Sequence, residues 1–239
     1  MGLKLTILGR CGSYPGPGEA CSGYLVRSGT TTLMVDAGSG TLANLQRHVS
    51  IKDVDGILLT HEHPDHWTDV TGFYVASKYY LELKNVPVFA PASVREHVYY
   101  NDAPIEWRVI TEGDRVTFGD LELSFSKTNH PPETLAVRID ADGRSLAYSA
   151  DTGPGWSFSS LGDGIDLALC EATYLKDDEG KAQHLSARQA GEMARAAGVD
   201  RLVLTHLQPG TDPEESRREA TETFGKPVSV AEENEDYEV

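Results

Sequence analysis

The stretch that most constrains the fold is 57–66, which reads Ile-Leu-Leu-Thr-His-Glu-His-Pro-Asp-His. Its apolar start, Ile57 to Leu59, predicts a buried strand. The polar residues that follow place three histidines and an aspartate on the turn at the carboxyl end of that strand. Because open α/β sheets bind ligands at this edge, the stretch predicts an α/β fold with a ligand site there.

The spacing within this turn suits two metal ions. His61 and His63 are two residues apart, so in an extended turn their imidazoles point the same way, whereas Asp65 and His66 can face a second point. The alternative is a polar surface turn that happens to be rich in histidine, and the specificity of the motif argues against it. We therefore expect one loop to serve two cations.

Other residues of metal-binding type also follow predicted strands. Together with the turn they form one set of nitrogen and oxygen donors: His61, His63, Asp65, His66, His130, Asp151 and His206. Such donors suit borderline or hard divalent ions, so we expect zinc first, with manganese and iron as alternatives. The natural division is one ion on His61, His63 and His130, a second on Asp65, His66 and His206, and Asp151 bridging the two.

Two divalent ions roughly 3.5 to 4 Å apart can activate a shared water and hold the oxygens of a phosphoryl or acyl centre. The donor set therefore predicts metal-assisted hydrolysis. Such a reaction also needs a proton for the leaving group, and His184, which lies outside the donor set, is the candidate donor. Glu171 can orient His184 or raise its pKa. A structural salt bridge between the two is the alternative.

Strand and helix patterns alternate along the chain without a linker. The pattern from 107 to 148 predicts strands of a second sheet, and 166–170 and 201–204 predict further buried strands. We therefore expect one domain over residues 1–239. Residues 231–239 are acidic, and we expect them to form a solvated tail.

The composition of the chain limits the classes of partner that the protein is expected to bind. The net charge of −16 disfavours non-specific nucleic-acid binding, which requires a surface rich in lysine and arginine. No apolar run is long enough to span a bilayer and no leader precedes the first strand, so we expect a soluble, cytoplasmic protein without a membrane partner.

Cys11, Cys21 and Cys170 lack a Cys-x-x-Cys pair, which predicts reduced thiols. The glycine-rich segment 9–18 is either a plain connection or a loop whose amides approach a phosphate.

The motif Thr60-His-Glu-His-Pro-Asp-His66, together with Asp36 and the later ligand candidates, resembles the metallo-β-lactamase superfamily. The resemblance implies a four-layered αβ/βα sandwich with two mixed β-sheets and a dinuclear site at the sheet edges. It also implies that Asp36 orients the metal loop and that Asp65 is both a ligand and a base.

Three further segments are similar to ribonuclease Z and its phosphodiesterase relatives: Leu8–Ser13, Glu171–Tyr174 and His184–Ser186. This similarity implies that Glu171 and His184 act as an acid pair. However, only 63 residues separate His66 from His130, without the basic arm that holds tRNA in that branch, so the chain looks closer to short bacterial members, some linked to cyclic nucleotide hydrolysis.

We therefore predict a dinuclear phosphodiesterase that acts on a small substrate such as a cyclic nucleotide. A ribonuclease Z-like tRNA 3′-processing endonuclease and a metal-binding protein without turnover are the alternatives, with RNA the disfavoured substrate. A homodimer remains open.

Overall fold

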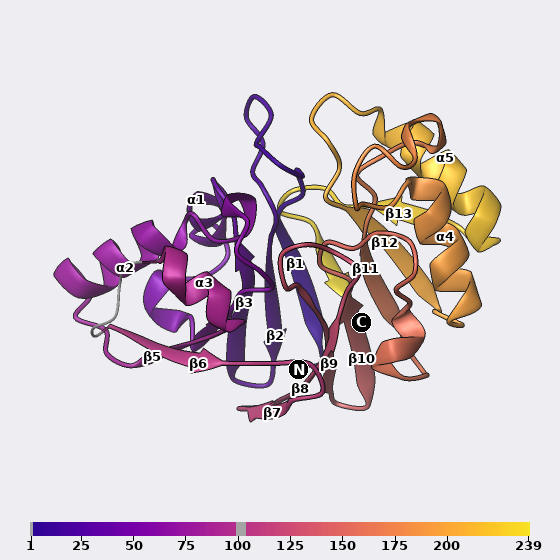
Figure 1. Cartoon of the computed structure of the whole chain (residues 1–239). Coiled ribbons are helices and arrows are strands. Elements are labelled where there is room, and N and C mark those ends of the chain that lie inside the picture. Colours follow the sequence, from indigo (N-terminus) through magenta and orange to yellow (C-terminus); the bar gives the residue numbers. More distant parts are fainter. Residues whose placement is uncertain (1, 99–103) are drawn as a thin grey trace.

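The computed structural model describes residues 2–98 and 104–239. Within these residues, two seven-stranded sheets face each other and helices cover the outer face of each sheet (Figure 1). The strand orders are β14-β1-β2-β3-β4-β5-β6 and β13-β12-β11-β10-β9-β8-β7, and each sheet combines parallel and antiparallel pairs. The predicted four-layered αβ/βα sandwich is confirmed.

The strands of the first sheet are β1 (Lys4–Gly9), β2 (Gly23–Ser28), β3 (Thr31–Ala37), β4 (Gly56–Leu58), β5 (Val86–Ala90), β6 (Ile105–Val109) and β14 (Asp236–Glu238). Those of the second are β7 (Arg115–Phe118), β8 (Leu121–Lys127), β9 (Leu135–Ala141), β10 (Arg144–Tyr148), β11 (Leu167–Glu171), β12 (Arg201–Thr205) and β13 (Val228–Val230). The α-helices are α1 (Thr41–Leu45), α2 (Val70–Tyr79), α3 (Ala92–His97), α4 (Ala187–Ala196) and α5 (Pro213–Phe224). In the part of the chain that the structure describes, no helix is long and apolar enough to cross a membrane.

Three apolar clusters hold the layers together. The central one lies between the sheets and includes Leu33 and Tyr24 from the first sheet and Val137 and Ile139 from the second. The others join α1, α2 and α3 to the first sheet, and α4 and α5 to the second. Burial of apolar surface on both faces of each sheet explains why most of its strands are nearly continuous apolar runs.

Parallel pairing places the functional residues at one edge. β10, β11 and β12 are neighbouring parallel strands, so their carboxyl ends, which lead to Asp151, Glu171 and His206, lie side by side. β3 and β4 are likewise parallel neighbours, which sets Asp36 beside the start of the metal loop. The fold thus gathers residues that lie far apart in the sequence.

The expectation of a solvated acidic tail at 231–239 is wrong. Residues 236–238 form β14, which pairs with β1, and Asp236 lies 2.7 Å from the ammonium of Lys4. Glu233 accepts hydrogen bonds from the amide of Ala20 and the side chain of Asn44. The open edge of β1 offers backbone partners to the tail, and local donors offset its charge.

One strand also lies in a different sheet from the one expected. The sequence pattern assigned the strands from 107 onward to the second sheet, but β6 pairs in parallel with β5 in the first. The three cysteines are free and buried, as expected.

Candidate metal centre

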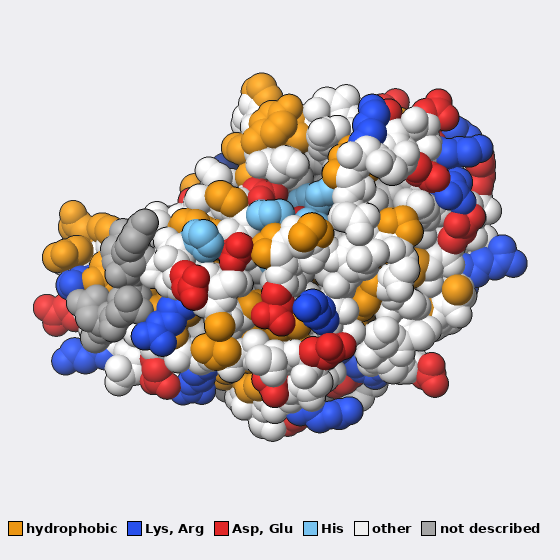
Figure 2. All heavy atoms as spheres, viewed as in Figure 1, with side chains coloured by type: hydrophobic (Ala, Val, Ile, Leu, Met, Phe, Trp, Pro, Cys, Tyr) orange, Lys and Arg blue, Asp and Glu red, His pale blue; other side chains and the backbone are white. Residues whose placement is uncertain are grey.

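All seven predicted ligands meet between the carboxyl ends of the strands, at a hollow in the surface where histidines are visible (Figure 2). Their ligand atoms fall into two groups, each within 4.8 Å: His61, His63, His130 and Asp151 in one, and Asp65, His66 and His206 in the other. The structure thus brings His61, His63 and His130 together and, separately, Asp65, His66 and His206.

Asp151 lies between the two groups. Its Oδ2 is 3.4 Å from His61 Nε2 and 3.9 Å from His130 Nε2. Its Oδ1 is 3.3 Å from His66 Nε2 and 3.4 Å from His206 Nε2. Since each oxygen faces a different group, the carboxylate has the placement of a bridging ligand.

Four of these histidines are held through their second ring nitrogen. The Nδ1 atoms lie 2.8 to 3.1 Å from protein oxygens, in the pairs His61–Thr60, His66–Asp36, His130–Thr134 and His206–Thr173. The three threonine hydroxyls each have a carboxylate or carbonyl oxygen to which to donate their single proton, so they accept from Nδ1–H. The lone pair then sits on Nε2 and faces the centre, as metal binding requires.

Asp36 anchors the metal loop through hydrogen bonds to Thr60. It is the penultimate residue of β3 and has a left-handed conformation with φ of 54°, and its carboxylate accepts hydrogen bonds from the amide and hydroxyl of Thr60 at 2.8 and 3.0 Å. It also accepts from the hydroxyl of Tyr148, across in the second sheet, at 3.0 Å. These contacts give Asp36 the geometry of the expected orienting residue.

The structure itself indicates that a cation belongs here. The buried atoms His61 Nε2, His66 Nε2 and Asp151 Oδ1 face one another's groups at 3.3 to 3.4 Å but form no well-oriented hydrogen bond in the described residues, which is costly for buried polar atoms. Burial lowers the pKa of His61 to about 4 and that of His130 to about 3, so both are neutral at pH 7, which is the form that binds metals.

The pKa of His66 reflects the negative charge of the centre. Burial alone lowers its pKa, but the carboxylates of Asp151, Asp36 and Asp65 outweigh burial and raise the pKa well above its usual value. Burial alone also raises the pKa of Asp151, but the surrounding histidines, His206 first, keep it well below its usual range. A divalent cation can replace the proton of His66, so the donors fit divalent metal binding.

The predicted acid pair is also assembled. His184 Nδ1 lies 3.0 Å from Glu171 Oε1, and its ring stacks on that of His206 with centroids 5.4 Å apart. Burial lowers the pKa of His184, but the hydrogen bond and charge of Glu171 prevail and raise it to about 9. The capping box of α4, formed by Ser186 and Gln189, fixes the backbone that follows His184.

Glu171 is fully buried and both of its oxygens are occupied. Oε1 accepts from the amide of Thr152 at 2.6 Å in addition to His184. Oε2 accepts from the amide of Leu185 at 3.2 Å and from the hydroxyl of Thr173 at 2.8 Å. This network holds the carboxylate in one orientation.

Sequence reasoning assigned no role to the three threonines that support the histidines. Thr173 is the most informative, because its hydroxyl joins Glu171 to His206. A local signal existed, since Thr60 directly precedes His61 and Thr173 lies two residues after Glu171. Threonine is so common at strand ends that this spacing alone could not identify the role.

The glycine-rich loop is more than a plain connection, because two of its amides donate hydrogen bonds to other parts of the protein. The amide of Ser13 donates to Asp65 Oδ2 at 2.7 Å, and that of Gly12 donates to the carbonyl of Leu207 at 2.9 Å. A Cβ on Gly12 would lie 2.7 Å from the ring of His206, so only glycine fits. The loop thus holds the centre.

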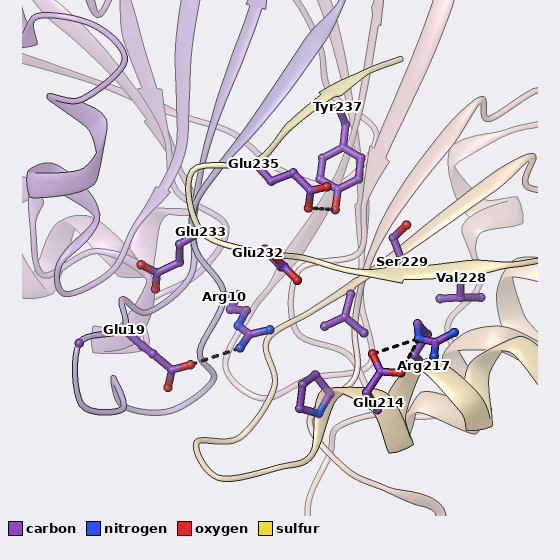
Figure 3. A pocket seen from close by; sticks show the side chains of 13 residues that line it. Arg10, Glu19, Glu214, Arg217, Val228, Ser229, Glu232, Glu233, Glu235 and Tyr237 are labelled. Atoms are coloured by element: carbon purple, nitrogen blue, oxygen red, sulfur yellow. Dashed lines mark hydrogen bonds and ion pairs between the residues drawn. The ribbon is translucent and has the colours of Figure 1, made fainter.

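A separate hollow lies away from these ligands. It has a volume of about 610 Å³ and lies between Arg10, Glu19, α5 and the C-terminal segment (Figure 3). Glu232, Glu233 and Glu235 crowd its wall, and the guanidinium of Arg10 lies 3.3 Å from Glu19. Since none of the predicted ligands lines it, we assign the functional site to the histidine cluster.

Comparison with known proteins agrees with this assignment. Residues 31–207 match the family model described as the beta-lactamase superfamily domain. The chain is 32% identical to the probable metallo-hydrolase YhfI of Bacillus subtilis, covering 96% of this chain and 97% of that protein. It is also 32% identical to ribonuclease Z of Methanopyrus kandleri, covering 95% and 94%.

Solved structures show the same fold. The crystal structure of YhfI from Bacillus subtilis matches with a TM-score of 0.92 and 29% identity, covering 100% of both chains. The short form of human tRNase Z matches with a TM-score of 0.79 and 18% identity, covering 98% of each. With its two-sheet sandwich, its clustered donors and these relatives, the chain belongs to the metallo-β-lactamase superfamily of metal-dependent hydrolases.

Proposed function

We propose that this protein is a dinuclear metal phosphodiesterase that acts on a small substrate such as a cyclic nucleotide. The observation that carries the proposal is the placement of His184, held by Glu171, beside the two ligand groups. Ligand atoms of Asp151, His184 and His206 all lie within 4.8 Å of one another. This proximity supports His184 as the donor of a proton to the leaving oxygen of a substrate bound at the centre.

The metal ligands in this proposal are the seven residues of the two groups, with zinc the first expectation. Two divalent ions held there would polarise a phosphoryl centre and lower the pKa of a water. Asp65 is kept as a carboxylate by its contacts with His66, His206 and the amide of Ser13. The charged form suits both of its proposed roles, ligand and base.

His184 acts as the general acid. Because its pKa is raised to about 9, the imidazole carries a proton at neutral pH. Its Nδ1–H is used by Glu171, which leaves Nε2–H as the proton to be transferred to a leaving alkoxide. A general acid of this kind contributes a factor of roughly 10² to 10⁴.

The make-up of the segment between His66 and His130 supports a small substrate. The segment from 67 to 129, where ribonuclease Z carries its arm, consists here mainly of α2, β5, α3, β6, β7 and β8, outside the undescribed residues 99–103. Its sequence has six lysines and arginines against nine aspartates and glutamates, so it offers no basic arm for RNA.

The test is hydrolysis of cyclic AMP and bis-p-nitrophenyl phosphate by the metal-loaded protein. We expect turnover of both, and loss with His63→Ala, which removes one proposed ligand. Turnover no higher than that of His63→Ala would refute the proposal and favour a metal-binding protein without catalysis.

Ribonuclease Z-like processing is the second candidate, supported by the similarity to the Methanopyrus kandleri protein. Cleavage of the 3′ trailer of precursor tRNA, lost in His184→Ala, would favour it. Absence of an RNA gel shift at low salt would exclude it, because phosphate contacts dominate RNA affinity under those conditions.

A further inference from the structure

The loop between β1 and β2 projects from the body of the molecule (Figure 1), and its residue Ser13 contacts the proposed ligand Asp65. In the space-filling view, hydrophobic side chains gather at its top, near the histidines of the centre (Figure 2). Tyr14 lies in this loop, and its side chain is 55% exposed. The prolines at 15 and 17 are exposed as well.

The base of the loop is rigidly attached to the centre. Ser13 turns the chain with a positive φ of 66°, and its amide donates to the proposed ligand Asp65. The amide of Tyr14 itself donates to the carbonyl of Gly12 at 2.8 Å. The exposed ring therefore belongs to the residue that directly follows a backbone amide in contact with a proposed metal ligand.

The local sequence also limits the backbone freedom of Tyr14. Pro15 restricts the backbone of the preceding Tyr14 to extended conformations, so less backbone entropy is lost when a ligand orders this residue. On the far side of the loop, Glu19 donates its amide to the carbonyl of Gly16 at 3.0 Å, which closes the turn. The loop therefore carries an exposed aromatic residue on a backbone that is hydrogen-bonded to the proposed ligand Asp65.

We propose that Tyr14 is a specificity residue that stacks on the nucleobase of the substrate while the phosphate lies in the metal centre. This inference rests on the proposed phosphodiesterase function and narrows its substrates to base-bearing phosphodiesters. An exposed aromatic face is sequence-tolerant, because every base offers a π-face, so the preference is for a base as such. The remaining exposed large apolar side chains of the described residues, Val75, Tyr79, Tyr80 and Val109, lie on or beside α2 and on β6.

The test compares two phosphate monoesters that differ only by the base, AMP and ribose 5-phosphate, in calorimetric titrations of the metal-loaded protein. We expect wild type to bind AMP more tightly. Tyr14→Ala should weaken AMP binding by about 5- to 100-fold and leave ribose 5-phosphate unchanged, since stacking contributes only to the base. Tyr14→Phe should retain the preference, and Tyr80→Ala, which removes a tyrosine away from the site, should behave as wild type.

Equal affinity of wild type for the two ligands, or an unchanged AMP affinity in Tyr14→Ala, would overturn the inference. Hydrolysis of bis-p-nitrophenyl phosphate, measured on the same samples, separates this failure from that of the function. If wild type hydrolyses the diester without preferring AMP, only the role of Tyr14 falls. If it hydrolyses no phosphodiester, the proposed function falls, and with it the inference that rests on it.

Discussion

Replacement of His184 by alanine should affect hydrolysis according to the leaving group. The proposed role of His184 is to protonate a leaving alkoxide, whereas p-nitrophenolate is a stable anion that leaves without a proton. We therefore expect His184→Ala to slow cyclic AMP hydrolysis by roughly 10²- to 10⁴-fold. Hydrolysis of bis-p-nitrophenyl phosphate should fall by less than about tenfold, since it needs no general acid.

The structure explains why this variant should leave the surrounding hydrogen bonds of Glu171 intact. After loss of His184, Glu171 still accepts hydrogen bonds from the amides of Thr152 and Leu185 and from the hydroxyl of Thr173. Glu171→Gln is less suitable, because an amide nitrogen at either oxygen position would face these donors. Each buried donor left unpaired costs about 1 to 3 kcal/mol.

The assay measures kcat for both substrates over a range of pH, with bound metal determined on the same samples. Because His184 donates a proton only below its pKa of about 9, wild-type hydrolysis of cyclic AMP should decline above that pH. His184→Ala should lack this decline and retain its metal. Equal losses with both leaving groups, or loss of metal, would refute the assignment of His184 as the acid.

Three further predictions concern the centre and its supports. Chelation should lower the melting temperature by about 5 °C or more and zinc should restore it, since a metal present at about 100 times its dissociation constant contributes about 2.7 kcal/mol; an unchanged melting curve would contradict a bound ion. Gly12→Ala, whose Cβ would lie 2.7 Å from the His206 ring, should weaken metal binding by about 10- to 100-fold in a competition titration with a chelator. Gly2→Ala, which meets nothing within 4 Å, is the control, and equal affinity in the two variants would contradict the contact. Removal of residues 231–239 should reduce the free energy of unfolding by about 4 kcal/mol, because four backbone hydrogen bonds that join this segment to Leu3, β1 and β12 contribute about 1 kcal/mol each; urea denaturation measures the change, and full stability of the truncated chain would instead support a solvated tail.

Much of the fold and the site followed from local patterns. The strand-then-histidine motif at 57–66 predicted both the sheet edge and two ligand groups, because side-chain direction along an extended turn depends only on residues within that turn. The same reasoning located His130, Asp151 and His206 at strand ends. The chemistry of these donors then limited the site to divalent cations.

Such local patterns did not predict which of the two sheets each strand joins. β6 and β7 are adjacent in sequence and similar in pattern, yet they lie at the edges of different sheets. The charge of the acidic segment at the C-terminus indicated a solvated tail, but residues 236–238 pair with the open edge of β1, more than 200 residues away in the sequence. Backbone pairing is independent of side-chain charge, so composition does not predict it.

The sequence by itself therefore determined which side chains bind the metal ions in our proposal and which face of the fold carries them. Only the tertiary structure decided how these side chains are held. The position of Asp151 between the two groups depends on the register of the parallel strands β10, β11 and β12. The contact of Thr173 with both Glu171 and His206 depends on the same register. The reason is physical: ligand type is a property of a residue, whereas orientation comes from hydrogen bonds between strands that only folding brings together.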